Sequence, residues 1–69
     1  MKPGELRRVT HITVAFPGIR LHPDEFLIFL GDTFQNWQGM RTMGMLKVLC
    51  KHGIRFVFWS SLNEKTTKA

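Results

Sequence analysis

Two apolar runs near the end of the chain, Met45 to Cys50 and Ile54 to Trp59, are joined by the polar segment Lys51-His52-Gly53. Both runs are rich in β-branched and aromatic side chains, which favour strands. Gly53 can take the positive φ that tight hairpin turns require. The pattern therefore predicts a β-hairpin over residues 45–59, and we expect it to organise the fold.

Apolar residues occupy both faces of this predicted hairpin. One set contains Leu46, Val48, Cys50, Ile54, Phe56 and Phe58, and the other contains Met45, Leu49, Val57 and Trp59. Lys47 and Arg55 interrupt the second set. The pattern thus predicts one buried face and one partly wet face that carries both cations.

The first third of the chain also favours strands. Glu5 to Val9 follows a Pro-Gly turn and is predicted as a first strand, and Thr10 to Phe16 alternates as a second strand or a bent continuation. In this alternation Ile12, Val14 and Phe16 form the apolar side. Pro17-Gly18 ends the strand, and 18–24 is predicted to be a loop because X-Pro steps disfavour regular structure.

Glu25 to Phe34 fits two structures. Phe26 to Leu30, followed by Gly31, indicates a buried strand, and we favour it because a glycine inside a helix is unfavourable by about 1 kcal/mol. The alternative is a helix over residues 23–38, which gives an α+β fold of βαββ order. Residues 35–44 are predicted to be a long loop, and the polar tail 63–69 is expected to fray.

Length and charge narrow the class of protein. A chain of 69 residues forms one small domain, 1–69, and its single Cys excludes an intrachain disulfide. Such a domain gains stability from a partner protein or from copies of itself. The net charge of +5 favours acidic partners, including nucleic acid. We expect no signal peptide, no membrane span and a cytoplasmic location.

Two stretches resemble a known group of proteins. Residues 1–9, MKPGELRRV, and residues 45–62, with Lys47-Val48-Leu49, Gly53 and Val57-Phe58-Trp59-Ser60-Ser61-Leu62, are similar to small bacteriophage proteins with an SH3-like barrel. The resemblance implies a mostly β, five-stranded barrel with a long loop before the 45–59 hairpin. It also implies that Gly53 makes the turn, that 60–62 forms a one-turn helix and that Leu62 plugs the barrel. It implies no activity, because SH3-like barrels host many binding functions.

Residues suited to catalysis are sparse. Asp24 and Glu25 are the only adjacent carboxylates, and neighbours on an extended chain point to opposite faces. Cys50 and His52 supply at most half of a zinc site, and Cys50 on an apolar strand favours an inert thiol. We therefore expect no enzyme activity, no cofactor, no metal and no small-molecule substrate.

The predicted interface is an apolar cluster with basic neighbours: Phe34, Trp37, Met40, Arg41, Met43, Lys47 and Arg55. Aromatic residues, Met and Arg are enriched at the centres of protein interfaces. We interpret the chain as a non-enzymatic protein-interaction module of phage type, either a small virion or assembly component or an effector that binds a host protein. Its location is then the virion or the host cytoplasm. The alternative is a basic nucleic-acid-binding barrel that uses Arg7, Arg8, Lys47, Lys51 and Arg55.

Overall fold

The computed structural model describes residues 1–32, 36–37, 40–41 and 45–69. In chain order the elements are β1 (Leu6–Val9), β2 (Thr13–Ala15), β3 (Ile19–Leu21), β4 (Phe26–Asp32), β5 (Asn36–Trp37), β6 (Met40–Arg41), β7 (Met45–Cys50), β8 (Gly53–Phe58), α1 (Trp59–Lys65) and β9 (Thr66–Lys68). The expectation of a mostly β fold is confirmed.

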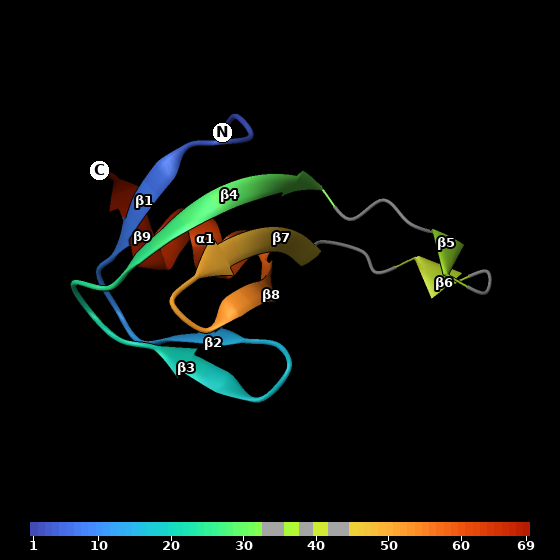
Figure 1. Ribbon diagram of the computed structural model, residues 1–69, viewed down its shortest axis with the longest axis horizontal. Helices are drawn as coiled ribbons and strands as arrows, with labels where there is room; N and C mark the ends of the chain where they lie inside the picture. The colour runs from blue at the N-terminus through green and yellow to red at the C-terminus, as the bar shows by residue number, and fades with distance from the viewer. Residues whose placement is uncertain (33–35, 38–39, 42–44) are drawn as a thin grey trace.

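Five strands form one antiparallel sheet in the order β8-β7-β4-β1-β9 (Figure 1). β2 and β3 pair as a separate hairpin, which joins the edge of β8 through a single bridge between Phe16 and Phe56. β5 and β6 form a third, two-stranded unit that extends beyond the ends of β4 and β7 (Figure 1). The described strands are thus divided between one five-stranded sheet and two hairpins.

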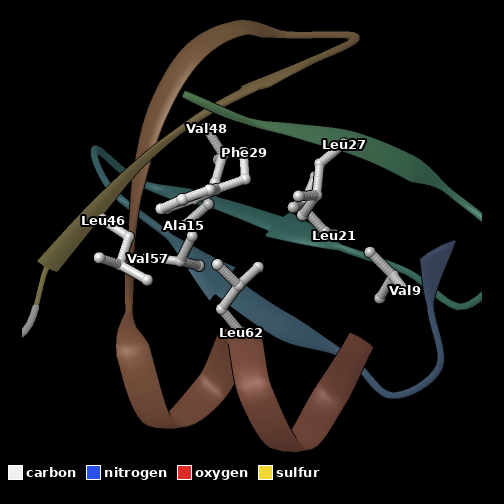
Figure 2. Packing of buried hydrophobic residues seen from close by; sticks show 9 residues of the cluster. All are labelled: Val9, Ala15, Leu21, Leu27, Phe29, Leu46, Val48, Val57 and Leu62. Atoms are coloured by element: carbon white, nitrogen blue, oxygen red, sulfur yellow. The ribbon is translucent and has the colours of Figure 1, made fainter. Parts of the chain in front are cut away.

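The hydrophobic core lies between the five-stranded sheet, the β2–β3 hairpin and α1 (Figure 2). Nine buried apolar residues make it: Val9, Ala15, Leu21, Leu27, Phe29, Leu46, Val48, Val57 and Leu62. Leu62 is the buried residue of α1 and points from the helix into this cluster (Figure 2).

Residues 26–32, for which the sequence allowed a strand or a helix, form the strand β4, so the alternative prediction of a helix over residues 23–38 is wrong. β4 pairs with β1 on one side and with β7 on the other, and Leu27 and Phe29 point into the core. The register shifts between Phe29 and Gly31, and Gly31 has a φ of 127°. Such a bulge suits glycine, because other residues rarely adopt a positive φ.

The β2–β3 hairpin differs from the sequence prediction in two ways. Residues 19–21 form a strand rather than a loop, because Leu21 pairs with Thr13 and completes the core. The apolar side of the 10–16 alternation also faces outward: Ile12 and Val14 are 52% and 45% exposed, whereas Thr13 is buried. Thr13 donates its hydroxyl to the His11 carbonyl (2.9 Å), which satisfies a polar group in the core.

The 45–59 hairpin is confirmed, but the predicted grouping of its side chains is wrong. Lys51 and His52 form a two-residue turn, and Gly53, with a φ of 94°, pairs with Cys50. This register pairs Leu46 with Val57 and Lys47 with Phe56. Even-numbered residues of β7 therefore share a face with odd-numbered residues of β8, contrary to the predicted sets.

Two further segments differ from expectation. The predicted loop 35–44 contains the paired strands β5 and β6. The polar tail 63–69, which we expected to fray, forms the end of α1 and then β9, which pairs with β1. Thr66 is buried and its hydroxyl donates to the Leu62 carbonyl, so polar side chains hold this strand in place.

An apolar outer face as the candidate functional site

The five-stranded sheet is apolar on both faces. One face covers the core, and the residues that alternate with the core residues point away from it. We call this second side the outer face, and it comprises Leu6, Arg8, Phe26, Ile28, Met45, Lys47, Leu49, Ile54, Phe56 and Phe58. Eight of these ten residues are apolar, which is unusual for a sheet face over which no described helix or strand packs.

A row of aliphatic side chains crosses the middle of the outer face. Leu6 pairs with Ile28, Ile28 pairs with Leu49, and Leu49 pairs with Ile54, so the row spans four strands. Side chains in register on neighbouring strands lie about 5 Å apart and contact one another. Leu6, Leu49 and Ile54 are each about two-fifths exposed or more. The row is therefore a continuous apolar strip open to solvent.

A second row contains the single cation in the middle of the outer face. Gly31 pairs with Lys47, Lys47 pairs with Phe56, and Phe56 pairs with Phe16 of the neighbouring hairpin. Lys47 is half-buried, and within residues 1–31 and 45–69 it makes no ion pair. Its charge is thus held among apolar side chains.

Phe16 extends the outer face beyond the sheet. Its ring meets the ring of Phe58 edge to face, with the centroids 5.6 Å apart and an interplanar angle of 83°. This geometry is favourable because the positive edge of one ring faces the negative face of the other. Phe16, Phe26 and Phe58 remain 38%, 52% and 45% exposed.

The edge of β8 is blocked in two places. Phe16 exchanges two backbone hydrogen bonds with Phe56, of 2.7 and 2.9 Å. Two residues before Phe56 on the same strand, the Ile54 carbonyl accepts a hydrogen bond from Nη1 of the Arg55 guanidinium (2.8 Å). Both contacts occupy groups that an added strand would need. The outer face, rather than this edge, is accordingly the surface best suited to a partner.

The two cations predicted to share the hairpin surface lie on opposite faces. Lys47 is on the outer face, whereas Arg55 pairs with Val48 on the core side. The Arg55 Nε atom is buried and has no hydrogen-bond partner among the described residues. The prediction that Lys47 and Arg55 share a face is wrong because it did not use the two-residue turn, which pairs Arg55 with Val48.

The nucleic-acid alternative needs cations that the fold uses elsewhere. Arg7 donates to Glu5 (2.7 Å), and Arg8 and Lys51 pair with Asp24 and Glu25 (3.3 and 2.8 Å). β4 also separates β1 from β7. The five cations of that prediction therefore do not form one patch.

Two of these pairs shift carboxylate pKa values. The hydrogen bond from Arg7 lowers the pKa of Glu5 below its ordinary value of 4.5, although partial desolvation opposes the shift. The hydrogen bond from Lys51, followed by the backbone N–H of His22, lowers the pKa of Glu25 in the same way. Both carboxylates are thus held in the charged form near neutral pH.

The apolar interface cluster falls on the part of the chain between β4 and β7. Trp37 lies in β5 and pairs with Met40 of β6, and Arg41 pairs with Asn36. Phe34 and Met43 lie outside the described residues. For this cluster the structure gives strand pairing and nothing beyond it.

Metal-ligating groups do not gather in the described part of the chain. Cys50 is half-buried and its thiol donates to the Gly53 carbonyl (3.4 Å), while His52 lies exposed in the turn. Within residues 1–32 and 45–69, no three His, Cys, Asp or Glu residues are placed to hold a metal ion. The structure therefore does not complete the half-site that the sequence offers.

The sequence prediction did not identify most of the outer face. It selected Lys47 but not Leu6, Phe16, Phe26, Leu49, Ile54 or Phe58. One signal was present: in Phe26-Leu27-Ile28-Phe29 every residue is apolar, so a strand there must present apolar groups on both faces. The same holds for most of β7 and β8.

The described helix is short, and comparisons with known proteins find no match. α1 has seven residues, and no described helix has the length and hydropathy to cross a membrane. The chain matches no model of a known protein family, no curated protein and no solved structure.

Proposed function

We propose that this chain is a non-enzymatic protein-interaction module that docks through the outer face of its sheet. The proposal rests on one observation, the continuous exposed apolar surface formed by the Leu6–Ile28–Leu49–Ile54 row and the Phe16–Phe58 pair. Exposed apolar patches of this kind mark sites of protein association. The buried core lies on the other side of the sheet.

The finer form of the proposal follows the resemblance to small bacteriophage proteins. In it, the five-stranded sheet with α1 between β8 and β9 is an SH3-like domain, and the chain is a small virion or assembly component or an effector that binds a host protein. The strand order and the buried Leu62 support this proposal. The segment from Phe34 to Met45 adjoins the outer face in sequence and extends the proposed interface.

The mass of the native complex tests the proposed function. The protein is isolated at its natural level of expression and examined by native mass spectrometry. We expect a complex heavier than the 8.0 kDa monomer. The double variant Leu49→Ser, Phe58→Ser should release the monomer, because both side chains are exposed parts of the outer face.

Ile12→Ser is the matched control. Ile12 is apolar and 52% exposed, but it lies outside the outer face. The control should leave the complex intact. A monomeric wild-type protein, or a complex that survives the double substitution, would contradict the proposed function. Trp37→Ala tests the adjoining segment separately, and an unchanged complex would remove that segment from the interface.

A nucleic-acid-binding function is the weaker candidate, since three of its five cations are engaged in ion pairs. It predicts that binding to a 20-base-pair DNA or to single-stranded RNA falls steeply with salt concentration. Fluorescence anisotropy between 50 and 200 mM salt measures this dependence. Absence of binding at the lower salt concentration would dismiss it.

A further inference from the structure

We infer that the occupant of the outer face is an acidic protein surface, with apolar side chains on the aliphatic row and a carboxylate opposite Lys47. This inference rests on the proposed function and specifies the chemistry of the partner. It depends on the position of Lys47, on the carboxylates of the chain itself and on the area of the face.

Lys47 is the charge that a partner would have to accommodate. It lies in register between Gly31 and Phe56, and its neighbours along the same face of β7 are Met45 and Leu49. A docked partner would cover these apolar neighbours and remove water from the Lys47 amine. A buried ammonium without an opposite charge is strongly unfavourable, so the partner must supply a carboxylate there.

The described side chains of a second copy of the chain do not supply that carboxylate. Within residues 1–31 and 45–69, Glu5, Asp24 and Glu25 already pair with Arg7, Arg8 and Lys51. The remaining one, Glu64, is on α1, which lies across the core from the outer face (Figure 2). Two copies would also bring together two Lys47 residues and two net charges of +5. Like charges across an interface oppose association.

The size of the apolar surface fits a protein partner. If a full Phe side chain buries about 200 Å², the exposed parts of Phe16, Phe26 and Phe58 offer about 270 Å². The exposed parts of Leu6, Leu49 and Ile54 add roughly 200 Å². A standard interface buries about 800 Å² per partner, of which about 56–65% is apolar. The outer face supplies nearly that apolar share.

A pair of peptides tests the inference directly. The acidic probe is an 18-residue helical peptide with a leucine stripe flanked by glutamates, and the basic probe carries lysine at every glutamate position. Each is titrated into ¹⁵N-labelled protein, and amide shifts locate the binding surface. We expect the acidic probe to shift amides of β4, β7 and β8, and to bind at least tenfold more tightly than the basic probe.

Lys47→Glu should reverse this preference, so that the basic probe binds more tightly. Arg20→Glu is the matched control, because it makes the same change in net charge at an exposed position of β3, away from the outer face. The control should change the ratio of the two affinities less than threefold. Phe58→Ser should weaken the acidic probe at least tenfold. Amide spectra of each variant verify that it is folded.

The outcomes separate the two proposals. Equal binding of both probes at the outer face would overturn the acidic chemistry and leave the docking function standing. Absence of binding at the outer face would overturn both. Sedimentation of the free protein tests whether a second copy occupies the outer face. A dimer that Phe58→Ser dissociates would make the second copy the occupant and overturn the inference.

Discussion

Arg7 and Thr66 lie 59 residues apart and are joined by two hydrogen bonds. Arg7 donates from Nε to the Thr66 hydroxyl (2.7 Å) and from Nη2 to the Thr66 carbonyl (3.0 Å). The same guanidinium bonds Glu5. A single side chain of β1 thereby fixes the start of β9 and closes the end of the chain onto the sheet.

Replacing Arg7 should loosen that strand. Arg7→Ala removes three hydrogen bonds, and we expect a loss of about 1–3 kcal/mol in the free energy of unfolding. Urea denaturation measures it, and hydrogen exchange should show faster exchange at residues 66–68. Arg20→Ala, at an exposed position on β3, should change neither quantity appreciably. Unchanged exchange at residues 66–68 in Arg7→Ala would mean that pairing with β1 alone holds β9.

The Glu5–Arg7 pair also predicts how stability depends on pH. Because the pKa of Glu5 is lowered in the folded state, its contribution is present above about pH 4.5 and is lost as the pH falls through the folded pKa. The urea midpoint should therefore fall as the pH decreases from 6 to 3. In Glu5→Gln this fall should be smaller, although Glu25 still contributes to it.

Glu64→Gln is the comparison for that measurement, because Glu64 is exposed on α1. Its pH dependence should match that of the wild-type protein. If Glu5→Gln retained the full wild-type fall of the midpoint, the pair with Arg7 would have no part in acid stability.

Leu62 is the residue of α1 whose side chain contributes most to the core. Its side chain is fully buried among core residues from the sheet and the β2–β3 hairpin (Figure 2). Leu62→Ala should lower the free energy of unfolding by about 2–5 kcal/mol, because it removes buried methyl groups and leaves a cavity. Ile12→Ala, at a half-exposed site, should lower it by less than about 1 kcal/mol. Equal effects in the two variants would show that α1 packs loosely.

Gly53 tests the turn of the hairpin. A Cβ there would meet nothing closer than the Arg55 guanidinium at 3.9 Å, so space does not limit substitution. The backbone conformation does limit substitution, because the φ of Gly53 is 94°. Gly53→Ala should therefore lower the free energy of unfolding by about 1–2 kcal/mol. Gly53→Asn should lower it less, because Asn adopts positive φ more readily. Thermal unfolding of both variants gives the comparison, and an alanine variant as stable as the wild-type protein would contradict the strain at this position.

The sequence predicted the strands better than the faces. The 45–59 hairpin and the strand at Phe26 follow from composition and turn residues. The face of each hairpin residue depends on turn length, because one residue more or fewer inverts the pairing parity of the second strand. Grouping Ile54 and Phe56 with Leu46 was therefore wrong, and so was placing Lys47 and Arg55 together.

The remaining differences also arise from tertiary contacts. Thr13 is polar but buried, and Val14 is apolar but exposed, because β2 packs its small residues against the core. Alternation of apolar and polar residues indicates a strand, but it does not show which of the two faces packs against the core. Likewise, the tail 63–69 has no apolar pattern, yet Arg7 and Thr66 hold β9 in the sheet.

The blocked edge of β8 determines how this protein behaves when it is concentrated. A small β protein with an exposed apolar face would ordinarily be prone to growth of fibrils, in which strands add one after another along an open edge. Here the Arg55 guanidinium and the backbone of Phe16 occupy hydrogen-bonding groups along that edge. Strand addition at high concentration should accordingly not proceed along the edge of β8.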